Sequence, residues 1–325
     1  MDFIRKSLTW LSVGVILVSC TQNDTVVITS FPIEKSIKYS DYDTYDIIDP
    51  AGIVVSDSYL FLLGLKSEPI FQQYELQEMK YVRSFGIRGR GPDEFMESPS
   101  MYVSHNPEKF YIYRFWEKSV TAYQILKDGD LAQENIFIIN KGGTMNQFHI
   151  IKDSLIVYNL VPQIGIVKIE LSEDDRFSKI EFDKNKDYPE DFFHPNYGTL
   201  SVNDRYIVYA YKYRKQIDIY DIDNMKLKTR LLAYGHREEI TISEQSKGYY
   251  YDVYTTNNFI YAYYVNPDSG DSKNKYFIEV FDYSGTPIIR YNIGISLGGL
   301  FAVSSKDDVM YSFSWELEKI LKFDL

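Results

Sequence analysis

The chain alternates short polar turns with runs of aromatic and β-branched residues, and this pattern recurs six times along its length. Alternation of apolar and polar positions is typical of β-strands, and turns rich in Ser, Asn and Asp separate such strands. The strand segments that directly follow a polar turn are 59–62, 110–113, 155–158, 206–209, 259–263 and 309–311. They recur about every 50 residues, which suits one four-stranded propeller blade per unit.

Each unit continues after this segment as an antiparallel meander. A second alternating strand follows, most clearly at 216–220 and 276–281, and then a turn such as 282–285 and a further strand. We therefore predict an all-β fold, a six-bladed β-propeller of four-stranded antiparallel blades that forms one domain over residues 25–325. The alternative is a β-sandwich with a smaller second domain.

The two ends of the chain complement each other in this scheme. The sixth unit stops at 319–325, one strand short of a full blade, whereas 26–28 and 37–39 are surplus strand-like segments near the N-terminus. We expect the two ends to pair, since an N-terminal strand in the last blade would close the ring and cover its open edges.

The first twenty residues have the features of an export signal. Arg5 and Lys6 precede an apolar run, 8–18, which is too short for a comfortable membrane span but fits a signal-peptide core. The run ends in Leu17-Val18-Ser19-Cys20, which resembles the lipobox of bacterial lipoproteins.

These features predict a lipid-anchored protein. We expect residues 1–19 to be a lipoprotein signal peptide, Cys20 to be lipidated and 20–24 to form a tether. Several acyl chains on one cysteine hold a protein stably at a membrane. We therefore expect location in the cell envelope, at the outer membrane, and the sequence leaves open whether the protein faces the periplasm or the cell surface.

Composition narrows the classes of partner. The chain has 46 acidic and 35 basic residues, a net charge of −11, so a nucleic-acid partner is not expected. Its single cysteine excludes an internal disulfide and a cysteine-rich metal site, and 16% aromatic residues favour β-structure. We expect a monomer without a cofactor.

A distinctive loop follows the first unit. Residues 85–95 read Phe-Gly-Ile-Arg-Gly-Arg-Gly-Pro-Asp-Glu-Phe. This string, together with the lipobox and the six repeats, resembles the TolB-like six-bladed propeller lipoproteins of Bacteroidetes. The resemblance implies a cell-envelope propeller and supplies no catalytic residue.

The residues of this loop themselves indicate a structural turn. Gly89 and Gly91 permit positive φ angles and close backbone approach, and Pro92 stiffens the exit toward the next unit. We expect Glu94 to accept hydrogen bonds from the loop backbone, while Arg88 or Arg90 pairs with a carboxylate. A phosphate cradle is not favoured, because no Lys-Ser/Thr ending or helix pattern follows.

Loop lengths indicate which face of the propeller binds. The long connections 86–99, 183–196, 233–247 and 266–275 would all lie on one face, where binding residues usually concentrate. Aromatic and arginine side chains in these loops would suit a glycan or a protein, although each aromatic could instead seal a gap between blades. The candidate contacts are Arg88, Arg90, Arg114, Trp116, Phe192, Phe193, His194, Tyr213, Arg214, His236 and Arg237.

Catalytic and metal motifs are weak. Gly294-Ile295-Ser296-Leu297-Gly298 matches G-x-S-x-G, but a strand follows it where a nucleophile elbow needs a helix, so we assign Ser296 to a turn. Asp183, Asn185 and Asp187 begin like a calcium loop, yet Tyr188 replaces the required glycine. The four histidines have no metal-ligand spacing. We therefore name no catalytic residue and no metal ligand.

Two functions remain in view. The favoured one is a membrane-anchored, non-catalytic module that binds a protein or a glycan through its long-loop face. The alternative is a metal-assisted hydrolase or lyase with its site at the propeller channel, where ligands from several blades could converge without any sequence motif.

Overall fold

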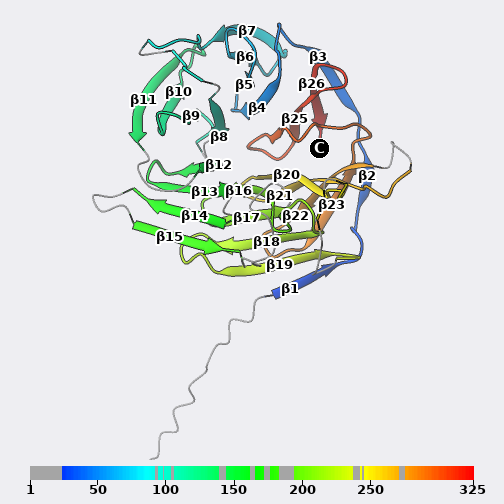
Figure 1. The fold of residues 1–325 in the computed structure, drawn as a ribbon. Coiled ribbons are helices and arrows are strands. Elements are labelled where there is room, and N and C mark those ends of the chain that lie inside the picture. The colour runs from blue at the N-terminus through cyan, green and yellow to red at the C-terminus, as the bar shows by residue number, and fades with distance from the viewer. Residues whose placement is uncertain are drawn as a thin grey trace, which may run out of the picture.

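The computed structural model describes residues 24–91, 94–97, 99–103, 106–138, 144–161, 165–171, 176–182, 194–236, 242–243, 245–270 and 275–325. All regular elements within these ranges are β-strands, and no helix there could cross a bilayer. The strands form six sheets arranged as the blades of a propeller (Figure 1).

Blades 1 to 5 each contain four consecutive strands joined as antiparallel neighbours, and blade 6 contains three consecutive strands and one from the N-terminal segment. Blade 1 contains β4 (Pro50–Val55), β5 (Tyr59–Gly64), β6 (Phe71–Glu75) and β7 (Lys80–Phe85). Blade 2 contains β8 (Ser100–Val103), β9 (Lys109–Arg114), β10 (Ser119–Ile125) and β11 (Leu131–Ile138). Blade 3 contains β12 (Thr144–Ile151), β13 (Leu155–Val161), β14 (Gly165–Glu170) and β15 (Arg176–Glu181).

The second half of the ring repeats this order. Blade 4 contains β16 (Gly198–Val202), β17 (Tyr206–Tyr211), β18 (Gln216–Asp221) and β19 (Leu227–Ala233). Blade 5 contains β20 (Tyr250–Thr255), β21 (Ile260–Val265), β22 (Tyr276–Phe281) and β23 (Pro287–Asn292). Blade 6 contains β24 (Phe301–Val303), β25 (Val309–Ser314) and β26 (Lys319–Asp324), and its fourth strand is β3 (Tyr39–Asp43).

The first strand of every blade lies innermost, and these strands contact one another around a closed ring. The contacts run from β4 through β8, β12, β16, β20 and β24, and β24 returns to β4. The predicted six-bladed propeller of four-stranded antiparallel blades is therefore confirmed.

The N-terminal segment closes the ring as predicted. Strand β3 pairs antiparallel with β26, and Tyr39 lies opposite Phe323. The earlier strand-like segment has a different place from the one expected, because β1 (Asp24–Ile28) pairs parallel with β19 of blade 4 rather than with the last blade.

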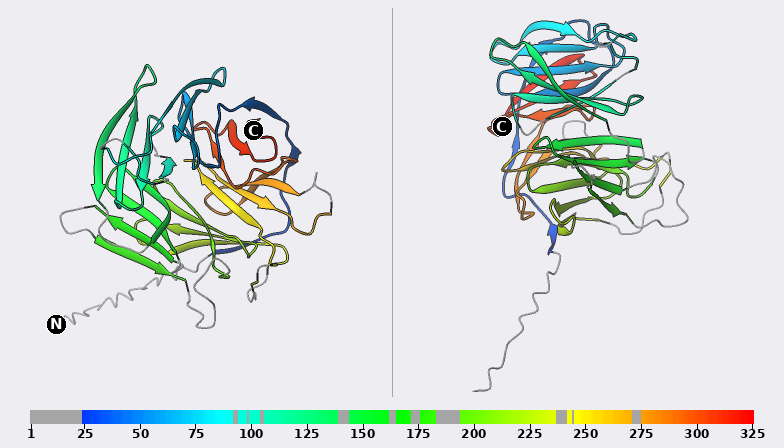
Figure 2. Two further views of the ribbon diagram at one scale, coloured as in Figure 1. Left: turned by 45° about the horizontal axis from the view of Figure 1, so that its top comes forward. Right: turned by 90° about the vertical axis from the view of Figure 1, so that its left-hand side faces the viewer.

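A third short strand, β2 (Glu34–Ser36), pairs parallel with β23 of blade 5. Residues 24–43 thus run along the outer edges of blades 4, 5 and 6 in turn, and this blue segment follows the rim of the molecule in Figures 1 and 2. We call this segment the belt. It covers edges that would otherwise present unpaired N–H and C=O groups.

The blades pack face to face through apolar side chains, which explains the long hydrophobic runs in the sequence. All six residues of β21 are buried, because the sheet is covered on both faces. One core cluster joins Val208 and Ile219 of blade 4 to Ile260 and Phe281 of blade 5. Alternation therefore weakens in the central strands and persists in the outer ones, such as β7.

Connections differ sharply between the two faces of the disc. On one face, the turns that join the first strand of a blade to the second, such as 56–58 and 304–308, have three to five residues. At the other face lie the strand ends that are farthest apart in sequence, those between β7 and β8, β15 and β16, β19 and β20, and β21 and β22. We call these the short-turn face and the long-loop face.

Candidate functional site

The loop between blades 1 and 2 is organised around Glu94. Its Oε2 accepts a hydrogen bond from the Gly91 amide at 2.8 Å. A Cβ on Gly89 would lie 1.9 Å from the same oxygen, so any larger residue would displace the Glu94 carboxylate from its place. The loop closes on itself through hydrogen bonds from the Gly89 amide to the Phe95 carbonyl and from the Phe95 amide to the Ile87 carbonyl.

The arginines of this region have structural partners. Arg88 donates to the Leu65 carbonyl, and its Nε lies 3.6 Å from Glu68 Oε2. Arg114 is buried, with its guanidinium 4.5 Å from the Phe95 ring centroid and Nη1 3.3 Å from Glu117 Oε2. Arg90 is exposed. Arg114 therefore packs against the loop through Phe95.

Large apolar side chains are exposed beside this loop. Trp116 is 74% exposed and meets Phe115 edge to face, and its backbone amide donates to Glu97 Oε1 at 2.6 Å. Because the Trp116 side chain is so exposed to solvent, it does not seal a gap between blades. We call the set Ile48, Ile87, Met96, Phe115 and Trp116 the apolar patch.

A second feature lies across the long-loop face, in the turn between β17 and β18. The Lys212 ammonium lies among three tyrosine rings, with its Nζ 5.6 Å from the Tyr197 centroid, 5.3 Å from Tyr213 and 5.5 Å from Tyr251. Burial lowers the pKa of Lys212. We call Lys212 and these rings the tyrosine cage.

Tyr251 also forms a wall of an adjacent cavity of about 430 Å³ between blades 5 and 6. We call this cavity the tyrosine groove. Tyr263 Oη accepts a hydrogen bond from the Leu297 amide at 3.1 Å and lies 3.4 Å from Ser296 Oγ. The groove is lined by Lys247, Gly248, Tyr251, Tyr263, Val265, Pro267, Lys275, Tyr276, Ser296, Gly298 and Gly299.

Ser296 thus lines the tyrosine groove from the turn that the sequence assigned to it. The turn contains Gly298 with φ of 61°, and a Cβ there would lie 2.0 Å from Trp315 Cδ1. Ser296 Oγ contacts the Tyr263 hydroxyl and the Gly298 amide, and within the described residues neither contact involves a histidine.

Asp252, next to Tyr251 on the innermost strand of blade 5, has an unusual carboxyl group. Burial raises its pKa to about 8, although the backbone amides of Val253 and Phe301 donate hydrogen bonds to it. Because Phe301 begins β24, this carboxyl links the inner strands of blades 5 and 6.

The other predicted contacts are divided between buried and accessible positions. Tyr213 and His194 are buried, at 6% and 9% exposure, and His194 Nδ1 accepts from the Asn196 amide. Arg214 and His236 are partly exposed on the loops of blade 4. Five predicted residues lie outside the described part of the chain, namely Cys20, Pro92, Phe192, Phe193 and Arg237.

Sequence reasoning selected Tyr213 and Arg214 but passed over Lys212 in the same turn. A signal was present, because a lysine flanked by tyrosines on both sides in a tight turn is placed for cation–π contacts. Tyr251, Tyr263 and Tyr276 were also missed, since in sequence they read as ordinary strand residues of blade 5.

His149 links two blades. His149 is buried, and its Nε2 lies 3.1 Å from the Leu200 carbonyl oxygen, which ties blade 3 to blade 4. Among the described residues, no three His, Cys, Asp or Glu side chains are grouped to hold a metal ion.

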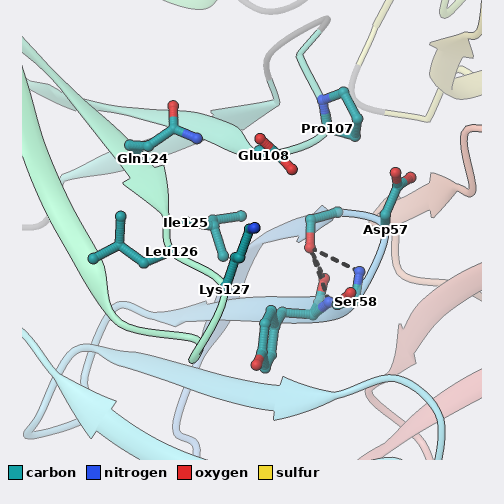
Figure 3. A pocket seen from close by; sticks show the side chains of 10 residues that line it. Asp57, Ser58, Pro107, Glu108, Gln124, Ile125, Leu126 and Lys127 are labelled. Atoms are coloured by element: carbon teal, nitrogen blue, oxygen red, sulfur yellow. Dashed lines mark hydrogen bonds between the residues drawn. The ribbon is translucent and has the colours of Figure 1, made fainter.

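The short-turn face also has a cavity, of about 400 Å³, between blades 1 and 2. Asp57, Glu108 and Lys127 lie at its walls in Figure 3. Ser56 Oγ accepts a hydrogen bond from the Tyr59 amide at 2.8 Å and fixes the turn that forms one side of this cavity. This cavity has one tyrosine in its lining, whereas the tyrosine groove has three.

Comparison with known proteins agrees with this architecture. The family described as TolB-like 6-blade propeller-like matches residues 29–306, whereas no curated protein matches the chain. Among solved structures, the chain is similar to a Bacteroides fragilis protein that is thought to be exported, with 12% identity and a TM-score of 0.56 over 92% of this chain and 99% of that one. It is also similar to virginiamycin B lyase from Staphylococcus aureus, with 12% identity and a TM-score of 0.49 over 89% of this chain and 100% of that one.

At 12% identity, the likeness to the Bacteroides fragilis protein bears on the fold alone. The family match is different in kind, because it covers most of the chain and coincides with the six observed blades. The chain therefore belongs to the TolB-like six-bladed β-propeller family.

Proposed function

We propose that this protein is a non-catalytic binding module of the cell envelope, held to a membrane by a lipid on Cys20, and that its long-loop face binds a protein or a glycan. The observation that carries the proposal is the position of the apolar patch and the tyrosine groove, which both open on this face. Exposed aromatic side chains on rigid loops are typical of binding surfaces.

The start of the belt supports the anchoring part of the proposal. Asp24 begins β1 at the outer edge of blade 4, and only residues 21–23 separate it from Cys20. Four residue steps of extended chain span at most about 14 Å. A lipid on Cys20 would therefore hold the rim of the disc close to the membrane and leave the long-loop face accessible from the side.

The binding part is tested by affinity capture with the full-length chain from solubilised envelopes of its own bacterium. Trp116→Ala combined with Tyr251→Ala removes one aromatic from each feature of the long-loop face. Leu126→Ala combined with Val82→Ala is the matched control, since these side chains are 42% and 44% exposed elsewhere on the surface. We expect the first pair to lose the captured partner and the second to retain it. Equal capture by both pairs would contradict the proposal.

A further inference from the structure

We propose that the tyrosine groove and Lys212 together form a binding site for an acidic sugar, a saccharide that carries a carboxylate or a sulfate group. This inference rests on the proposed function and names the class of ligand for one part of the long-loop face.

The Lys212 ammonium lies partly out of water. Its ammonium is half-buried, and burial is the influence that lowers its pKa. Within the described ranges, no carboxylate lies within ion-pair distance of it and no acceptor binds its Nζ, so the three tyrosine rings are its surroundings. Removing water from a cation without supplying an anion costs free energy, and an anionic ligand would offset that cost.

Other buried lysines of the chain show what a purely structural lysine looks like here. Lys109 Nζ lies 2.6 Å from Glu134 Oε2 and 3.0 Å from Asp153 Oδ2. Lys168 Nζ donates to the Ile222 and Asp223 carbonyls and lies 3.3 Å from Glu170 Oε1. These lysines have anionic or carbonyl partners within the fold, which is the arrangement that Lys212 lacks among the described residues.

Lysine side chains surround the tyrosine groove. Lys247 and Lys275 line the tyrosine groove, and Lys212 Nζ lies 5.5 Å from the ring centroid of its Tyr251 wall. Lys247 Nζ lies 3.4 Å from Asp268 Oδ1, an exposed pair that is weak in water. Two lysines therefore line this cavity and a third lies against its Tyr251 wall, so positive charge is concentrated here in a chain whose net charge is −11.

The size and lining of the tyrosine groove suit a sugar. The volume of about 430 Å³ lies in the range of small-molecule sites, about 300–1,000 Å³. Tyr251 is 39% exposed, and with Tyr276 it offers aromatic surface against which a sugar ring can pack. The partly exposed Ser296 supplies a hydroxyl for hydrogen bonds to a sugar, and the buried Tyr263 hydroxyl holds the Ser296 turn in place. Flat aromatic walls, hydroxyls and cations together fit an anionic ring better than an apolar peptide side chain.

The site is tested by calorimetric titration of the full-length protein in detergent. The probes are tetragalacturonic acid, its fully methyl-esterified form, a carrageenan tetrasaccharide that carries sulfate but no carboxylate, and tetraglutamate. We expect one of the two acidic sugars to bind, and the one that binds decides between a carboxylate and a sulfate ligand. If the site recognises the carboxylate, the methyl ester should bind at least about tenfold more weakly than the acid.

Lys212→Met, which keeps the length and apolar stem of the side chain, should weaken binding of that sugar by about tenfold or more, and Lys212→Arg should retain most of it. The matched control is Lys228→Met, because Lys228 also lies over a tyrosine, 4.2 Å from the Tyr206 centroid, outside the groove. Each variant is first checked for an unchanged thermal unfolding midpoint.

Three results would overturn the inference: no binding of either acidic sugar, equal binding by Lys212→Met and Lys228→Met, or tetraglutamate binding as tightly as the sugars. Failure of the acidic-sugar site can be distinguished from failure of the proposed function by partner capture. Loss of sugar binding leaves partner capture through the apolar patch intact, whereas failure of the whole face abolishes the Trp116-dependent capture as well.

Discussion

Glu279 and Arg290 face each other across β22 and β23, and Glu279 Oε1 accepts hydrogen bonds from Arg290 Nε at 3.0 Å and Nη2 at 2.5 Å. The Glu279 side chain is 2% exposed. Blade 4 has the same arrangement between Asp218 and Arg230, and an arginine of the fourth strand thus neutralises a buried acid of the third.

Removing the arginine from this pair should destabilise the protein. In Arg290→Met, the buried carboxylate of Glu279 loses its counter-charge, and we expect the free energy of unfolding to fall by about 3 kcal/mol, since Arg290 is itself 26% exposed. Urea denaturation measures the loss. Glu279→Gln combined with Arg290→Met should recover part of it, and a double variant no more stable than the single one would contradict this explanation.

The belt should be required for a cooperative fold. A chain that begins after Asp43 lacks the fourth strand of blade 6 and uncovers the outer edges of β19 and β23. We expect it to aggregate, because unpaired strand edges associate with one another. The control chain begins at Asp24. Size-exclusion chromatography and thermal unfolding compare the two, and a monomeric, cooperatively melting short chain would disprove this role.

The repeat and its closure could be predicted because they follow from local patterns. Six turn-and-strand units at a regular period define six blades, and a missing last strand requires a partner from elsewhere in the chain. The pairing of Tyr39 with Phe323 confirms that reasoning. The parallel pairing of β1 and β2 could not be predicted in the same way, since an outer edge offers a backbone partner to any short extended segment and residue pattern does not choose among edges.

The loop between blades 1 and 2 should depend on Gly89. A Cβ there would collide with Glu94 Oε2, so Gly89→Ala should cost about 1–3 kcal/mol of stability. In a Glu94→Ala background the colliding group is absent, and the cost should fall below about 1 kcal/mol. Gly270→Ala is the control, because a Cβ at Gly270 meets nothing within 4 Å. Equal costs in both backgrounds, measured by denaturation, would refute this contact.

Asp252 should make stability depend on pH. Its folded-state pKa of about 8 lies above the ordinary value of 3.8, so the folded protein binds a proton that the unfolded chain releases between these values. The contribution of Asp252 to the free energy of unfolding is therefore fully present below about pH 4. It declines by about 1.4 kcal/mol per pH unit as the pH rises toward 8.

Asp252→Asn keeps an acceptor for the Val253 and Phe301 amides but cannot ionise. We expect the variant to be more stable than the wild type at pH 8 and the difference to vanish near pH 4. Denaturation at several pH values measures this, and a difference that stays constant with pH would show that Asp252 titrates normally.

The candidate site could be predicted less completely than the fold. Loop lengths identified the long-loop face, but exposure of single residues depended on contacts between blades. Arg114 is buried because its guanidinium lies on the Phe95 ring of another loop. Lys212 gained its surroundings from Tyr251, a residue of the next blade that no local pattern connects to it.

Site-specific photo-crosslinking in living cells tests most directly whether the long-loop face is the binding face. A photoreactive phenylalanine analogue replaces Trp116 or Tyr251 on that face, or Leu126 on the short-turn face, in the full-length chain. We expect crosslinked partners from position 116, position 251 or both, and none from position 126. Crosslinks from position 126 alone, or equally from all three positions, would contradict the assignment of binding to the long-loop face.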